Sequence, residues 1–157
     1  MSMSVFLTLK ANGSDVEGSS LESNRDGTIE CASFDYGVNS GSVTGRATAD
    51  RDYEPVRIVK RQDKATPLIW KALCDNAVIE AIFQFYRPNA DGVTENYYTV
   101  ELKEARIANI DFSSPHSNFE GGSQASPTES VTIVFNNMKQ VFNDGGIEHE
   151  DVWRDRT

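Results

Sequence analysis

Short segments in which apolar and polar residues alternate recur along most of this chain, and this alternation is what most constrains its fold. In the segment 78–86, for example, Ile79, Ala81, Phe83 and Phe85 form one wholly apolar face. Successive side chains of a strand point to opposite faces, so a period of two is typical of a strand with one face in a core. Clusters of Gly, Asn, Asp and Ser between these segments indicate tight connections.

The alternating segments predict a mainly β fold of antiparallel strands. The segments 78–86 and 97–103 flank a turn cluster at 87–92 and fit a β-hairpin. About eight strands are enough for a closed or nearly closed barrel, or for a sandwich. The expected strands are 5–11, 28–38, 56–62, 78–86, 97–103, 105–112, 130–136 and 139–142.

One segment has helical spacing instead. Ile69 and Ala72 recur at helical intervals within it. Thr66 suits the N-cap, and Pro67 suits the first turn, where a fixed φ and a missing N–H cost least. The sequence therefore predicts one α-helix that begins at Thr66, ends at Asn76 and lies across an open end or face of the β structure.

Two long segments, 38–52 and 113–128, lack periodicity and have the composition of loops. Long loops in a compact domain are uncommon and often functional, so these are the first places to look for function. After Asp144 the chain becomes acidic. We divide it into a β domain over residues 1–144 and an acidic carboxyl-terminal tail over residues 145–157.

Composition restricts the possible partners. The 157 residues suffice for one domain with a sizeable core. The chain has 15 Lys and Arg against 24 Asp and Glu, a formal charge of −9, which disfavours nucleic acid and anionic membrane surfaces because both bind clustered basic residues. We expect no secretory signal and no span of roughly 20 apolar residues that could cross a bilayer. Cys31 and Cys74 form no metal-binding or disulfide pattern.

Residues that could carry chemistry lie in patterns that favour other interpretations. The run 39–46 is glycine-rich but lacks the Lys and Ser or Thr that follow in a phosphate-binding loop. Residues 148–151 offer metal ligands, but a solvated terminus is favoured there. We therefore expect no enzyme activity, no metal and no cofactor. Two alternatives stay open: a small hydrolase using His116 or His149, and a monomeric β-sandwich that binds carbohydrate or peptide through 113–128.

Arg57, Lys60, Arg61 and Lys64 make the one basic cluster of the sequence. On a strand, Arg57 and Arg61 share one face while Lys60 faces the other. The cluster fits an acidic surface on a neighbouring copy of the same protein. Ordinary exposed charge, with Asp63 as a local partner, fits equally well.

The segment 56–73 combines a strand that ends in a lysine with an Asp-Lys-small-Thr-Pro stretch at the start of the helix. It resembles the signature of the haemolysin-coregulated protein (Hcp) family, the tube-forming component of bacterial type VI secretion. The matching positions are Lys60, Asp63, Lys64, Thr66 and Pro67. Further stretches agree with the family in order and spacing at 6–7, 29–38, 99–107 and 127–133, so the resemblance covers about residues 5–143.

The resemblance implies an Hcp-like β-barrel flanked by one helix, with six copies closed into a ring and rings stacked into a hollow tube. In that family the tube lies inside a contractile sheath, carries a spike protein at its tip and can hold effectors in its lumen. A tail tube protein of a phage-like contractile injection device is the close alternative. The resemblance also implies synthesis in the cytoplasm and secretion through the type VI machine without a signal peptide.

The segment 38–52 is our candidate for contacts between neighbouring subunits or stacked rings, because of its position in the family pattern and its lack of core-forming residues. Exposed arginines of the strand that follows join it. The candidate contact residues are Thr44, Gly45, Arg46, Asp50, Arg51, Asp52, Arg57 and Arg61.

Overall fold

The computed structural model describes residues 3–21, 25–43, 45–114 and 127–153. These residues form one nine-stranded sheet and one helix. The fold is mainly β, as the alternation predicted. The elements are β1 (Ser4–Ala11), β2 (Ser14–Val16), β3 (Ile29–Val43), β4 (Arg46–Arg61), α1 (Thr66–Cys74), β5 (Ile79–Pro88), β6 (Thr94–Ser113), β7 (Thr128–Val134), β8 (Asn137–Phe142) and β9 (Ile147–Val152).

Six of the strands close into a ring. β1 pairs with β3, β3 with β4, and β4 with β7. β7 then pairs with β6, β6 with β5, and β5 returns to β1. All of these pairings are antiparallel, so the expected antiparallel β-barrel with one flanking helix is confirmed.

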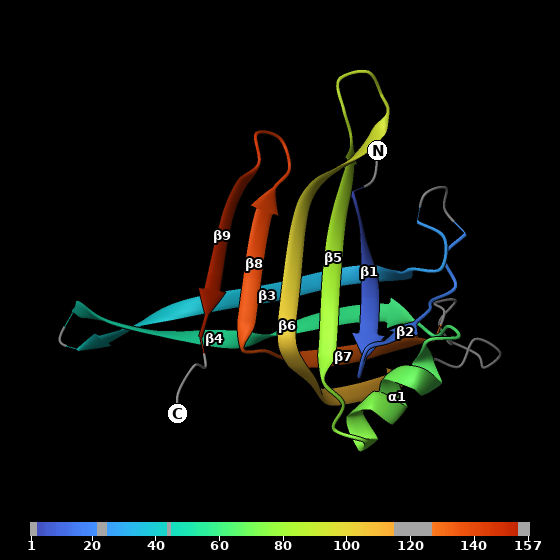
Figure 1. Ribbon diagram of the computed structural model, residues 1–157, viewed down its shortest axis with the longest axis horizontal. Coiled ribbons are helices and arrows are strands. Elements are labelled where there is room, and N and C mark those ends of the chain that lie inside the picture. The colour runs from blue at the N-terminus through green and yellow to red at the C-terminus, as the bar shows by residue number, and fades with distance from the viewer. Residues whose placement is uncertain (1–2, 22–24, 44, 115–126, 154–157) are drawn as a thin grey trace, which may run out of the picture.

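Strand β6 bends sharply at Glu104, which has a φ of 51°. Before the bend, residues 98–103 pair with β8, and after it, residues 106–113 pair with β7. The upright strands β1, β5, β6, β8 and β9 consequently run across β3, β4 and β7 (Figure 1), as in orthogonally packed sheets. The sequence predicted two strands, 97–103 and 105–112, where the structure has one bent strand.

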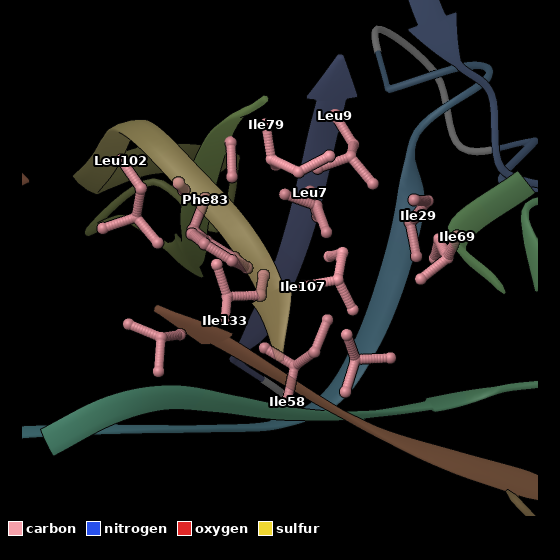
Figure 2. Packing of buried hydrophobic residues seen from close by; sticks show 14 of the residues in the cluster. Leu7, Leu9, Ile29, Ile58, Ile69, Ile79, Phe83, Leu102, Ile107 and Ile133 are labelled. Atoms are coloured by element: carbon pink, nitrogen blue, oxygen red, sulfur yellow. The ribbon is translucent and has the colours of Figure 1, made fainter. Parts of the chain in front are cut away.

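The apolar faces of these strands meet inside the barrel. Leu7 and Leu9 of β1, Phe83 of β5 and Ile133 of β7 point into one cluster and are at most 2% exposed (Figure 2). The ring of Phe34 on β3 reaches across to Phe83, with a centroid separation of 4.7 Å. Full burial of such a side chain stabilises a fold by about 1.5–3 kcal/mol, so this interior is the main source of stability.

Helix α1 lies beside one end of the barrel (Figure 1). Its buried residues are Ile69 and Ala72. Its boundaries differ slightly from the expected ones. Ala65 occupies the N-cap, with no side-chain capping bond, and the helix ends at Cys74 before the C-cap residue Asp75. Thr66 is instead the first residue of the helix, and its hydroxyl contacts Lys60 of β4 and Glu129 of β7.

The segment 38–52, expected to be a loop, is instead the outer part of the long β3–β4 hairpin. Pairing continues from Gly37 opposite Glu54 to Val43 opposite Arg46. We call residues 37–43 and 45–54 the arm; they pair with no strand except each other, and the arm projects beyond the barrel at the left of Figure 1. Backbone hydrogen bonds hold such a ribbon without an apolar face, so its sequence shows no alternation.

The acidic segment after Asp144 exposes most of its side chains, as expected of a solvated terminus, but it is not a free tail. Gly145 and Gly146 turn the chain with φ values of 85° and 62°. Residues 147–152 then form β9, which pairs with β8 along its whole length. The proposed boundary between 144 and 145 therefore falls in the β8–β9 turn. The free edge of β8 accepts this strand even though most of its side chains are exposed.

Candidate functional site

Three of the five signature residues lie in a buried polar cluster at the junction of β4, α1 and β7. Lys60, next to the end of β4, is the direct register partner of Glu129 on β7. Lys60 is 0% and Glu129 1% exposed. Asp63 lies in the connection between β4 and α1, and Thr66 is the first residue of α1. Strand pairing thus brings together charges that lie 69 positions apart in the sequence.

The four side chains form one hydrogen-bonded network. The Lys60 ammonium lies 2.5 Å from Glu129 Oε1 and 2.9 Å from Asp63 Oδ1. The Thr66 hydroxyl donates to Glu129 Oε1 at 3.0 Å and accepts the Asp63 backbone N–H at 3.0 Å. Asp63 Oδ1 in turn accepts the backbone N–H of Ala65 at 3.0 Å. Because a buried charge is costly unless it is paired and hydrogen-bonded, this network fixes how the three segments meet.

The other two signature residues lie outside the network. Lys64 is exposed, and its ammonium lies 3.8 Å from Glu17. Pro67 is exposed in the first turn of α1, where its missing N–H costs nothing. Of the five signature positions, the structure therefore brings three together.

Glu129 was not among the expected site residues, although the sequence places this charged residue on the apolar face of a strand. In β7 it shares a face with Val131 and Ile133, both buried. Lys60 in the same way shares the buried face of β4 with Val56 and Ile58. A single charge on each of two otherwise apolar faces indicates a buried ion pair, but only the strand register shows that the two charges meet.

The basic cluster is split between two environments, as the strand alternation predicted. Arg57 and Arg61 are exposed on the outer face of β4, and Asp35 is the cross-strand neighbour of Arg57. Lys60 is buried against Glu129, so the expectation that Lys60 could offset charge on a neighbouring copy is wrong. A lysine needed to neutralise an interior carboxylate cannot also reach another molecule.

The other candidate contact residues lie mostly on the arm. Gly45 and Arg46 are exposed at its tip, and Asp52 is exposed near its base. Arg51 is also at the base, where its guanidinium makes an ion pair with Asp151 of β9. Thr44 lies outside the described residues, and the placement of the Asp50 side chain is likewise outside them.

Of the residues singled out for possible catalysis or metal binding, those in the described parts of the chain are not assembled into a site. His149 is exposed on β9 opposite Gln140, and His116 lies outside the described residues together with most of 113–128. Within the described parts of the chain, the acidic and histidine side chains form no group of three or more that could hold a metal ion. No helix in these parts is long and apolar enough to span a bilayer.

The arrangement of barrel, arm and signature network can be compared with known proteins. Residues 6–142 match a family model described as "Type VI secretion system effector, Hcp". The chain belongs to the Hcp family. This confirms the resemblance drawn from the signature around Lys60 and Thr66.

Individual proteins are similar to this chain in sequence or in fold. The "Major exported protein" of Pseudomonas aeruginosa is 26% identical over 152 residues, covering 95% of this chain and 88% of that protein. The fold is that of Hcp1 of E. coli EAEC 042, with a TM-score of 0.85, 24% identity and coverage of 97% and 99% of the two chains. The secreted protein Hcp3 of Pseudomonas aeruginosa gives a TM-score of 0.76 at 20% identity, with coverage of 98% and 99%.

Proposed function

We propose that this Hcp protein is a structural tube subunit of a bacterial type VI secretion system, without catalytic activity. Six copies form a ring, and rings stack into a hollow tube that a contractile sheath expels. The tube carries a spike protein at its tip and holds effectors in its lumen. The subunit is made in the cytoplasm and leaves through the type VI machine. The match to a type VI family model favours this tube over that of a phage-like device.

The arm is the observation that carries this proposal. From Gly37 to Val43 it runs seven residues past the barrel, six of them paired, which is roughly 20 Å at the usual rise per residue. A two-stranded ribbon is marginally stable alone in water, and its unpaired edges invite other chains. A projection of this kind is costly for a monomer but serves a subunit that reaches its neighbours.

Head-to-tail contact between copies closes into a ring when the rotation between neighbours divides the circle. In the proposed assembly the arm of one copy contacts the next copy or the next ring. The residues that make these contacts are Thr44, Gly45, Arg46, Asp50, Asp52, Arg57 and Arg61, with Arg51 at the base of the arm. Each copy carries a charge of −9, so contacts through Arg46, Arg57 and Arg61 offset repulsion between copies.

Light scattering and electron microscopy of the purified protein test this function. We expect a ring-sized species and ring or tube images at micromolar concentration. A clean monomer at that concentration would contradict the tube subunit.

Deletion of residues 44–50 and the substitution Arg46→Glu test the role of the arm. Both should abolish assembly while circular dichroism shows the barrel still folded. Lys10→Glu provides a matched charge reversal at an exposed position on β1, away from the arm, and should assemble normally. Rings that form and stack unchanged without residues 44–50 would show that the arm has another role.

A further inference from the structure

The carboxyl-terminal strand contacts the arm at its base, where the arm leaves the barrel (Figure 1). The Arg51 guanidinium donates through Nε to Asp151 Oδ2 at 2.5 Å and through Nη2 to Oδ1 at 2.8 Å. This is the bidentate arrangement that makes arginine–carboxylate pairs geometrically specific. The Tyr53 hydroxyl donates to the same carboxylate at 2.7 Å. Two residues on one face of β4 therefore converge on one residue of β9.

Backbone atoms take part in the same contact. Arg51 Nη2 also donates to the carbonyl of Val152 at 3.3 Å, and the Trp153 indole donates to the carbonyl of Arg51 at 3.1 Å. The backbone N–H of Trp153 donates to the carbonyl of Asn136 at 2.8 Å. Residue 153 is thus bound on one side to the arm and on the other to the junction between β7 and β8.

An aromatic cluster connects this contact to the core. The Tyr53 ring packs edge-on against Trp153 and Phe135, with centroids 5.2 Å and 5.4 Å away. Phe135 is 2% exposed and belongs to the hydrophobic core. Edge-to-face pairs of this kind contribute about 0.5–1.5 kcal/mol beyond the area they bury. The base of the arm is therefore attached to the interior of the barrel through β9 and the residue after it.

Beyond its base, the described backbone of the arm pairs only with itself, and its register shifts between Ser40 and Ser42. Val38 is 53% exposed rather than packed. A short, irregular ribbon attached at one end would sample many directions, and ordering it on binding would cost conformational entropy.

We propose that β9 and Trp153 form a brace that holds the arm in one direction relative to the barrel, so that it is presented pre-organised to a second copy of this chain. The presentation of the arm to a second copy rests on the proposed tube function, whereas the bracing of the arm by β9 and Trp153 does not. Asp151 and Trp153 act here as positioning residues: they contact the base of the arm and leave its tip at Gly45 and Arg46 exposed.

Hydrogen–deuterium exchange measures the bracing without requiring assembly. In Asp151→Asn and Trp153→Ala, we expect the amides of residues 46–54 to exchange about tenfold faster, while those of β5 keep their protection. Glu150→Gln is the matched control: it removes one carboxylate charge from the same strand, at an exposed neighbour whose register partner is Lys139 of β8. Unchanged exchange of 46–54 in both brace variants would overturn the proposal.

Assembly of the same variants tests pre-organisation. If the arm must be ordered before it docks, Asp151→Asn and Trp153→Ala should raise the protein concentration at which rings form by about tenfold, and Glu150→Gln should not. If these two variants formed rings at a lower concentration than the wild-type protein, the contact with Asp151 would instead keep Arg51 from binding a second copy. That result would overturn the proposed brace. If the wild-type protein forms no rings, the proposed tube function is wrong. The hydrogen–deuterium exchange experiment still tests whether β9 and Trp153 hold the arm.

Discussion

Lys60 and Glu129 face each other as register partners on β4 and β7, fully buried, with 2.5 Å between Nζ and Oε1. The pair neutralises two interior charges and, through Asp63 and Thr66, sets where helix α1 begins. The Hcp signature therefore has a structural meaning in this chain. Three of its five residues, Lys60, Asp63 and Thr66, belong to a polar junction that joins β4, α1 and β7.

Replacing Lys60 by Met should destabilise the protein by about 3–5 kcal/mol, because it leaves Glu129 buried without its cation. The double variant Lys60→Met with Glu129→Leu should recover much of that loss, since no interior charge remains. Urea unfolding measures both. Lys64→Met, at an exposed position, provides the control and should change stability little. A single variant as stable as wild type would contradict the importance of this pair.

Gly18 is packed so closely that a larger residue cannot fit. A Cβ there would clash with the Thr28 carbonyl oxygen and would lie 2.8 Å from Ile29 Cα, both backbone atoms. Gly18→Ala should therefore cost about 1–3 kcal/mol in urea unfolding. At Gly37 an added Cβ would meet only the Glu54 carboxylate, at 3.1 Å, which can move aside. Gly37→Ala should cost clearly less, and equal losses at the two positions would refute this account.

The brace should open in acid. Partial burial disfavours the charge of Asp151, but hydrogen bonds from Arg51 and Tyr53 outweigh it and hold the pKa of the carboxyl below its ordinary value. Burial, together with the bond to Asp151, raises the pKa of Tyr53 to about 12. The Asp151 contribution is thus complete above the unfolded pKa of about 3.9 and lost as pH falls through the lowered value. The Tyr53 contribution persists below about pH 10 and is lost as pH rises through about 12.

Trp153 can report this opening, since Trp70→Phe leaves it as the single tryptophan of the two in the chain. We expect constant Trp153 emission between about pH 5 and 9, and a change below about pH 4 that Asp151→Asn removes. A transition at neutral pH, or an acid transition that persists in Asp151→Asn, would contradict the role of Asp151 in this opening.

The two cysteines should differ in reactivity. Burial raises the pKa of the Cys31 thiol to about 12, despite the nearby charge of Lys60, so almost no thiolate forms at neutral pH. Cys74 is exposed at the end of α1. Ellman's reagent should therefore modify one thiol quickly in the native protein and both in denaturant, with Cys74→Ser removing the fast reaction. Equal rates for both thiols in the native state would be inconsistent with the buried position of Cys31.

Ring assembly should respond to ionic strength. Each copy carries a charge of −9, and Arg57 and Arg61 are exposed on β4. Salt at about 0.1 M screens exposed charges beyond roughly 10 Å, so the concentration at which rings form should shift with salt. Arg57→Glu and Arg61→Glu should weaken assembly at low salt more than Lys10→Glu does. If tube formation did not depend on salt concentration, Arg57 and Arg61 would have no role in assembly.

The sequence alone determined the barrel strands, because each has a face such as Ile79, Ala81 and Phe83 that only a core can accept. It also placed Lys60 on the face opposite to Arg57 and Arg61, and its signature indicated the family. Alternation of apolar and polar residues marks a strand with one buried face, and most strands of the barrel have such a face. Neither the bend of β6 at Glu104 nor the helix cap at Ala65 has such a signal.

The arm, the strand β9 and the brace between them could be found only in the tertiary structure. The arm is held by its own backbone hydrogen bonds, and β9 by the free edge of β8, so neither needs an apolar face that a sequence pattern could show. Lys60 with Glu129 and Arg51 with Asp151 are pairs of residues far apart along the chain. Each residue is visible in the sequence, but their pairing depends on strand register and on how the sheet folds over itself, which the chain acquires only when the barrel closes.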